Sequence, residues 1–170
     1  MLARNETIFK WTLYAAATVL CFLAQSLVLQ RFTFWGVIPF LYPVLPAVTA
    51  TFEGPAAGAV YGLAVGVACD SLLPGPIPCF YTLVFPLVGL CGALVAQSLL
   101  PAGFLCSLVV SAISFLMTDF FHCFLLWAVG KSVWDTGLFL MLREFCVTAV
   151  WTVPVTLLFL TVFRRTRFDD

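Results

Sequence analysis

Long apolar segments alternate along the chain with short connections that are polar or rich in proline. Each apolar segment approaches the roughly 20 residues that a helix needs to cross the hydrocarbon core of a bilayer. We therefore expect an all-α, polytopic membrane bundle of about six transmembrane helices, forming one domain over residues 1–170. The predicted spans are 11–29, 37–52, 55–73, 80–100, 105–129 and 145–163.

Two segments depart from this simple pattern. The second span carries Pro39, Pro43 and Pro46, and each proline removes a backbone hydrogen-bond donor. We expect a kinked or partly broken helix that its neighbours shelter from lipid, and whether it crosses the bilayer fully stays open. Residues 131–144 mix apolar with charged side chains, which is typical of a short helix in the membrane interface or dipping into it.

The composition excludes a water-soluble domain. Hydrophobic residues make up 63% of the chain and charged residues 9%, whereas a soluble protein is about half apolar and about a quarter charged. The formal net charge is zero, so nucleic-acid binding has no electrostatic support. The seven cysteines are dispersed and form no C-x-x-C pair. No cofactor or metal is therefore expected, and the solvent for most of the chain is the lipid bilayer.

The basic residues indicate how the bundle is oriented. Lysine and arginine in short loops are retained preferentially on the cytoplasmic side of a membrane. With six spans both termini share one side, and that side carries more basic residues than the other. Arg4, Lys10, Arg164, Arg165 and Arg167 lie on the side of the termini, and Arg31, Lys131 and Arg143 lie on the opposite side. The difference favours a chain with both termini in the cytoplasm.

A row of small residues marks the third span. Gly54, Gly58, Gly62, Gly66 and Asp70 recur at every fourth position, so they follow one strip of the helix surface. Glycines at this spacing form a groove in which another helix backbone can approach closely. That helix belongs either to this chain or to a partner. Asp70, at the end of the row, either caps the backbone of the turn that follows or makes a polar contact with a partner or ligand.

A second polar feature lies inside the fifth span. Asp119 and His122 are three residues apart and therefore share a helical face. Ionisable residues inside a membrane are costly and point to function by default. The pair is interpreted as mutually satisfied and structural, as a contact for a partner or small ligand, or as a site of proton transfer or catalysis. A metal site lacks further ligands at suitable spacing, and the serines form no nucleophile motif, so no enzyme is expected.

The order of these features is similar to that of a known family. It runs from Phe22–Gln25 in the first span, through Pro39 and the glycine-rich stretch Glu53–Asp70, to the pattern Tyr81–Leu90 in the fourth span. This arrangement resembles the rod shape-determining protein MreD family, in which a glycine-rich third span ends in an aspartate before a short turn. The close match covers about residues 20–92.

The resemblance implies a noncatalytic, multi-pass subunit of the cell-elongation complex in the bacterial inner membrane. Such a subunit binds the single-span scaffold protein MreC and connects peptidoglycan-synthesis enzymes, directly or through MreC, with MreB filaments. The family is also similar in architecture to the substrate-binding S components of energy-coupling-factor transporters. The alternative function is therefore a substrate-binding membrane subunit of a vitamin-type transporter, with a small-molecule pocket near Asp119 and His122.

Overall fold

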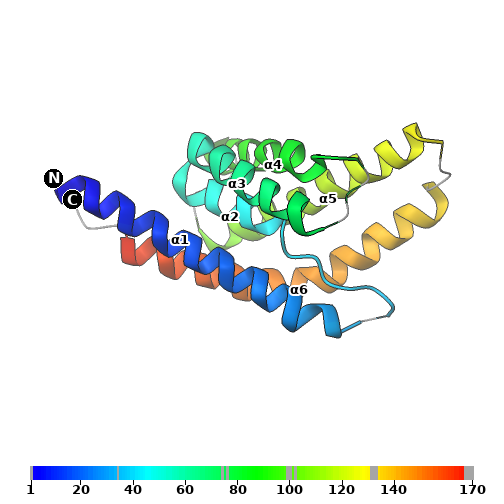
Figure 1. Ribbon diagram of the computed structural model, residues 1–170, viewed down its shortest axis with the longest axis horizontal. Helices are drawn as coiled ribbons and strands as arrows, with labels where there is room; N and C mark the ends of the chain where they lie inside the picture. The colour runs from blue at the N-terminus through cyan, green and yellow to red at the C-terminus, as the bar shows by residue number, and fades with distance from the viewer. Residues whose placement is uncertain are drawn as a thin grey trace.

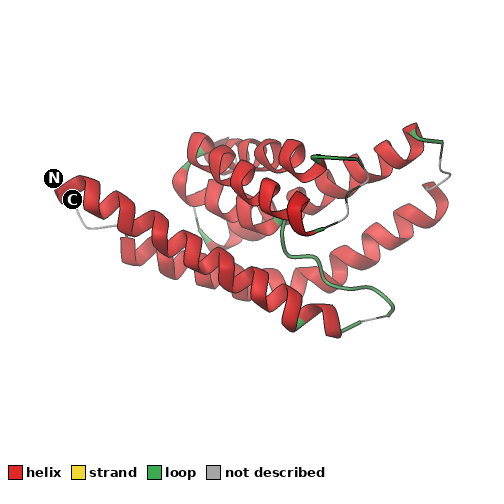
Figure 2. Cartoon of the chain, viewed as in Figure 1, coloured by secondary structure: helices red, strands yellow, loops and turns green. Residues whose placement is uncertain are grey.

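The protein is an all-helical bundle over the residues that the computed structural model describes, which are 2–33, 35–73, 75, 77–98, 101, 103–130 and 134–166. Figure 2 shows helices joined by short loops. The helices are α1 (Leu2–Leu27), the 3-10 helix η1 (Leu29–Arg31), α2 (Val44–Glu53), α3 (Pro55–Leu72), α4 (Phe80–Ser98), α5 (Phe104–Ala128) and α6 (Trp134–Thr166). Five helices, α1 and α3 to α6, are long and apolar enough to cross a membrane, where about six were predicted.

The second predicted span, 37–52, is helical only in its second half. Its first half forms turns and nonhelical chain, and α2 begins at Val44. Pro39 and Pro43 cannot donate the hydrogen bonds that an earlier helix would need. Pro46 is tolerated because it lies in the first turn of α2, where backbone N–H groups have no intrahelical acceptor. With 10 residues, α2 is too short to cross a bilayer alone.

The segment 37–53 nevertheless runs from one end of the bundle to the other. Figure 1 shows that α1 ends far from the chain termini, where this segment begins. At the other end of the segment, Glu53 forms an ion pair with Lys10, near the start of α1. Five long helices alone would leave the two termini at opposite ends. Because the mixed segment supplies a further crossing, the start of α1 and the end of α6 lie at the same end (Figure 1).

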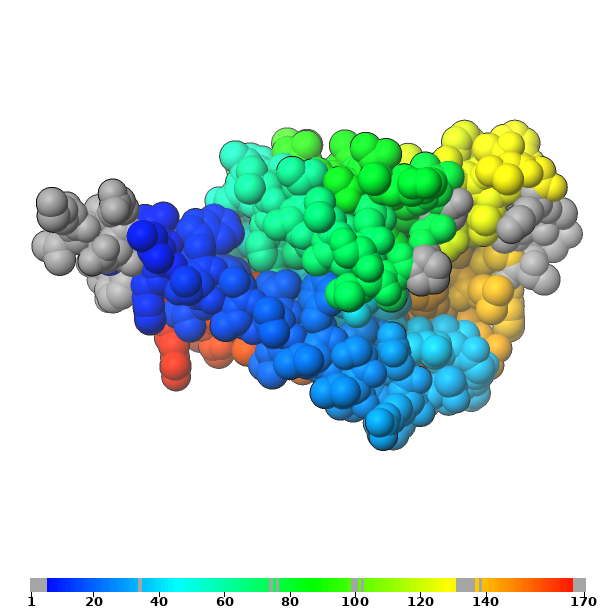
Figure 3. Space-filling model, in the orientation of Figure 1, coloured from blue at the N-terminus to red at the C-terminus, as the bar shows by residue number. Residues whose placement is uncertain are grey.

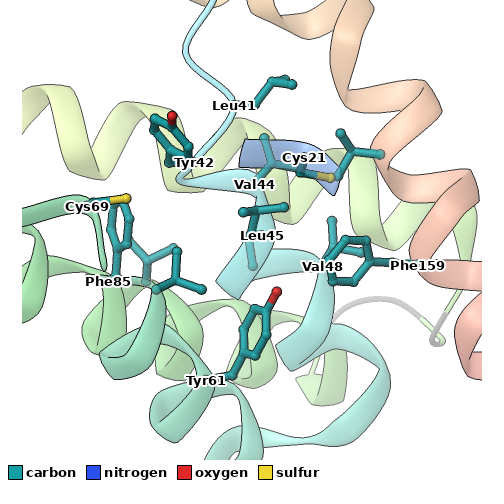
Figure 4. Close-up of a cluster of buried hydrophobic side chains, with 14 of the residues drawn as sticks. Cys21, Leu41, Tyr42, Val44, Leu45, Val48, Tyr61, Cys69, Phe85 and Phe159 are labelled. Atoms are coloured by element: carbon teal, nitrogen blue, oxygen red, sulfur yellow. The ribbon is translucent and has the colours of Figure 1, made fainter. Parts of the chain in front are cut away.

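The short helix α2 occupies the centre of the bundle. Its residues from Val44 to Thr51 are all buried, and it contacts α3, α4, α5 and α6. Figure 4 shows Val44, Leu45 and Val48 among buried side chains that come from the surrounding helices. The nonhelical chain before α2 is largely buried as well, with only Ile38 exposed among residues 37–43, as nonhelical backbone at membrane depth requires.

The first and last helices extend beyond their predicted spans. α6 is one continuous helix from Trp134, so residues 134–144 are its first part and not a separate interfacial or re-entrant helix. Hydropathy detects where apolar residues stop, whereas a helix continues while its backbone hydrogen bonds continue. Lys131, Arg167 and the side chain of Arg4, which entered the orientation count, lie outside the described part of the chain.

Candidate functional site

The middle of the glycine row packs α3 directly against α4. A Cβ atom at Gly62 would lie 2.6 Å from the carbonyl oxygen of Phe85, and one at Gly66 would lie 2.5 Å from the carbonyl oxygen of Tyr81. Both glycines are buried. Any side chain at these positions would force the two helices apart. The sequence predicted a groove in which another helix packs, and that helix is α4 of the same chain.

The first two glycines of the row have different roles, because one packs against α2 and the other forms a turn. Gly58 packs against Ala50 of α2, and its carbonyl oxygen lies 2.5 Å from where a Cβ atom of Gly89 on α4 would stand. Gly54 faces open space, but its φ of 90° lies in the left-handed region that favours glycine. It forms the break between α2 and α3. The row as a whole binds α2, α3 and α4 into one unit.

Asp70 caps the start of α4 from the end of α3. One carboxylate oxygen accepts a hydrogen bond from the backbone N–H of Tyr81 at 3.0 Å. The other accepts from the backbone N–H of Thr82 at 2.8 Å and from its hydroxyl at 2.5 Å. The first N–H groups of a helix lack intrahelical acceptors, and the helix dipole favours a negative charge there. Asp70 is thus a cap, although it holds the first turn of α4 and not the proline-rich turn before it.

Two polar side chains hold the nonhelical chain before α2: Gln25, which the sequence analysis includes in the stretch Phe22–Gln25, and Thr148, which it did not select. The buried amide of Gln25 on α1 donates to the carbonyl oxygen of Pro39 at 2.6 Å and accepts from the N–H of Leu41 at 3.1 Å. The N–H of Phe40 donates to the hydroxyl of Thr148 on α6 at 3.2 Å. These bonds pair backbone groups that lipid cannot satisfy. The signal in the sequence was a glutamine inside an otherwise apolar segment.

Asp119 and His122 share a face of α5, but they do not bind each other. No hydrogen bond or ion pair joins them, although both side chains are in the described part of the chain. The imidazole of His122 packs edge-on against Phe80 of α4, with ring centroids 5.7 Å apart. The charge of Asp119 instead lies close enough to interact with Glu144 of α6 and Tyr81 of α4. The contacts therefore do not support a mutually satisfied Asp119–His122 pair.

Three carboxylates from different helices surround the start of α4. Asp70, Asp119 and Glu144 all lie near the phenol of Tyr81. Asp70 is stabilised by its cap contacts, whereas no hydrogen bond to another described residue pairs Asp119 or Glu144. An ionised carboxylate in an apolar setting is costly unless it is paired, so Asp119 and Glu144 are candidates for a contact with a partner or ligand. Among the described residues, no three His, Cys, Asp or Glu side chains are arranged to hold a metal ion.

A second polar cluster lies at the opposite end of the bundle. Glu53, the last residue of α2, pairs with Lys10 of α1 and accepts a hydrogen bond from the hydroxyl of Tyr14 at 2.9 Å. The Glu53 side chain is only 8% exposed, so both partners are needed to compensate its burial. The cluster fixes the first third of α1 to the junction between α2 and α3. It is an anchor of the fold, and its Tyr14 also lines a cavity of about 270 Å³ between α1 and α3.

Several cavities of the bundle are apolar grooves on its surface. One of about 500 Å³ lies between α1 and α3, beside Phe22 and Leu72. Another of about 200 Å³ lies between α1 and α6, beside Leu20 and Pro154. A small-molecule site usually gathers several polar groups in one concave pocket, and these grooves contain few polar groups.

Comparison of the chain with protein-family models, with curated proteins and with solved structures found no match.

Proposed function

We propose that this chain is a noncatalytic, multi-pass subunit of a bacterial cell-elongation complex, with both termini on the cytoplasmic side of the inner membrane. It binds an MreC-like single-span scaffold and, through the complex, peptidoglycan-synthesis enzymes and MreB filaments. The observation that carries the proposal is the unit formed by the glycine row and Asp70. The residues that make the sequence resemble the MreD family are the same residues that join α3 to α4 in space.

The use of the polar side chains supports a role in assembly. Asp70, Gln25 and Glu53 each hold one helix or segment against another. The contacts of these three side chains are internal to the bundle. The long helices keep large apolar surfaces on their outer sides, with α1 the least buried of the five. In a membrane such surfaces meet lipid or the helices of other subunits.

Affinity purification from native membranes tests the proposal. The tagged protein is extracted in mild detergent, and the bound proteins and small molecules are identified by mass spectrometry. An unrelated multi-pass protein with the same tag, purified in parallel, controls for nonspecific capture. The expected result is recovery of an MreC-like scaffold in near-stoichiometric amount with the tagged chain and not with the control. A preparation that contains no such scaffold contradicts the proposal.

The acidic cluster at the start of α4 favours a second candidate function. Asp119 and Glu144 lie close enough for their charges to interact, and no hydrogen bond to a described residue pairs either of them. A cationic small molecule could neutralise both, as in a substrate-binding subunit of a transporter. This candidate predicts a stoichiometric small metabolite in the same preparation, lost in the variant Asp119→Asn. A preparation without a bound metabolite excludes it.

A further inference from the structure

The helices α1 and α3 are neighbours that leave a groove between them. α1 packs along α6 and reaches α3 through Tyr14 and Thr18, whose side chains contact Tyr61. These contacts lie at the floor of the groove, and the outer sides of the two helices stay apart. Figure 3 shows α1 in blue and α3 in cyan to green as neighbouring ridges on the face toward the viewer.

The groove extends along the whole apolar length of α1. It consists of a cavity of about 500 Å³ and one of about 270 Å³, which share Thr18, Val19 and Ala68 in their walls. Together they reach from Trp11 to Gln30. At a rise of about 1.5 Å per residue this distance is about 30 Å, the thickness of the hydrocarbon core. A single transmembrane helix matches this length, whereas lipids would have to fill the groove from both leaflets.

Small side chains lie on both walls of the groove. Ala15 belongs to α1, and Ala64 and Ala68 belong to α3, one turn apart. Helices associate in membranes where small residues let their backbones approach. Ala64 and Ala68 lie on a different face of α3 from the glycine row, which is occupied by α4. α3 therefore has one small-residue face that is used within the chain and one that is open.

A tyrosine that lines the groove has a hydroxyl without a hydrogen-bond partner among the described residues. Tyr42 is 4% exposed and lines the larger cavity, with its ring 4.5 Å from that of Phe22 between centroids. Figure 4 shows this ring beside Cys69, with the hydroxyl directed away from Leu45 and the aliphatic core. No hydrogen bond joins the hydroxyl to any side chain or backbone group of the described residues. A hydroxyl in an apolar environment gains from a hydrogen-bond partner, and the described part of the chain does not supply one.

We propose that the α1–α3 groove receives one transmembrane helix of the partner scaffold, and that an oxygen or polar side chain of this helix pairs with the Tyr42 hydroxyl. The inference rests on the proposed function, because it names the surface on which that subunit meets its partner. The occupant is an apolar helix that crosses the full bilayer and carries one hydrogen-bonding group near the depth of Tyr42. A lipid and a second copy of this chain are the competing occupants.

Tryptophan substitutions in the groove test this placement. Ala64→Trp and Ala68→Trp fill the groove, and Ala56→Trp places the same side chain on an exposed position of α3 outside it. Each variant is coexpressed with the tagged MreC-like scaffold. The amount of the variant that copurifies is measured relative to the amount of scaffold. We expect recovery to fall by about tenfold or more for the groove variants and to stay within about twofold for Ala56→Trp. Unchanged elution volume and unfolding temperature show that the variants are folded.

Photocrosslinking identifies the occupant directly. A photoreactive amino acid replaces Val19, which is 59% exposed and lines the groove, or Val150, which is 70% exposed on α6 and lies outside it. The expected adduct forms between position 19 and the transmembrane helix of the scaffold and not from position 150. An adduct from position 19 to a lipid alone or to a second copy of this chain overturns the proposal.

The hydroxyl is tested by Tyr42→Phe, which keeps the ring. We expect scaffold binding to weaken about threefold, the ordinary effect of one interhelical hydrogen bond in a membrane. Equal binding by Tyr42→Phe and the unmodified chain overturns the role given to the hydroxyl.

The outcomes separate the groove from the proposed function. If the unmodified chain and both groove variants bind the scaffold equally well, the groove is not the binding surface, and the proposed function stands. If the unmodified chain recovers none, the proposed function itself fails.

Discussion

The carboxylate of Asp70 holds Thr82 by two hydrogen bonds to one oxygen, from the backbone N–H at 2.8 Å and from the hydroxyl at 2.5 Å. The two residues are separated by 12 positions, most of them in the proline-rich turn between α3 and α4. One side chain therefore fixes the end of one helix, the start of the next and the path between them. Because the glycines of the same helix face seat α4 along its length, Asp70 also sets the register of that contact.

Replacing Asp70 by alanine removes the cap and leaves two N–H groups of α4 without acceptors. We expect the free energy of unfolding to fall by about 2 kcal/mol, since loss of a cap costs about 1 kcal/mol and these bonds are charge-assisted. Reversible denaturation in mixed micelles measures the change. Ser71→Ala is the matched control, because Ser71 is exposed and bonds only to its own helix. Equal stability of the two variants would falsify the capping role.

Gly62→Leu is expected to separate α3 from α4, because its Cβ atom would already lie 2.6 Å from the carbonyl oxygen of Phe85. The backbone has to move, and overpacking of this kind costs about 3 kcal/mol or more. The measurement is the midpoint of thermal unfolding together with the elution profile in detergent. Ala56→Leu adds a comparable side chain to an exposed position of the same helix and is expected to change neither. A stable, monodisperse Gly62→Leu protein contradicts the packing described above.

Gln25→Leu removes both partners of the nonhelical chain before α2. The carbonyl oxygen of Pro39 and the N–H of Leu41 then lie buried without hydrogen bonds. We expect a loss of about 2 to 4 kcal/mol, since each unsatisfied buried group costs about 1 to 3 kcal/mol. Hydrogen–deuterium exchange localises the effect, with faster exchange in residues 37–43. Gln97→Leu, at an exposed position of α4, serves as the control, and an equal loss there argues against the bracing role of Gln25.

Asp119→Asn is expected to stabilise the protein. The substitution loses no hydrogen bond to another described residue and removes a charge that lies close to Glu144. An amide avoids the cost of burying an unpaired charge, so the free energy of unfolding rises by about 1 kcal/mol. Glu144→Gln has the same effect, and the double variant gains less than the sum, because either change alone also removes the interaction between the two carboxylates. A marked loss of stability in Asp119→Asn shows instead that the carboxylate has a partner or ligand.

The apolar pattern identified the spanning helices, and it located the ends of α3, α4 and α5 closely but missed the starts of α1 and α6. The predicted span 55–73 coincides closely with α3, because Pro55 and the turn after Leu72 mark both boundaries in the sequence. The span 145–163 captured only part of α6, which starts at Trp134. Polar residues lower the hydropathy of a segment, but they do not interrupt the backbone hydrogen bonds of a helix.

The polar contacts were predictable where they are local and not where they depend on the fold. Asp70 lies in the last turn of α3 and precedes a proline-rich connection, so capping was among its interpretations. The approach of Glu144 to Asp119 depends on how α5 and α6 pack, and no spacing in the sequence reports it. The same holds for Tyr42, whose place in the α1–α3 groove is set by a path that three prolines impose on the chain.

The nonhelical chain before α2 has a consequence for the insertion of the protein into the membrane. Phe40 finds its hydrogen-bond acceptor on Thr148, which is synthesised 108 residues later. A helix emerging from the ribosome can leave the translocon for lipid at once, because its backbone groups are already paired. The segment before α2 cannot leave the translocon at that stage, because the acceptor for the N–H of Phe40, on Thr148, has not yet been synthesised. It has to wait in a protein or aqueous environment until nearly the whole chain has been made, so the bundle closes around its own centre as one of the last steps of insertion.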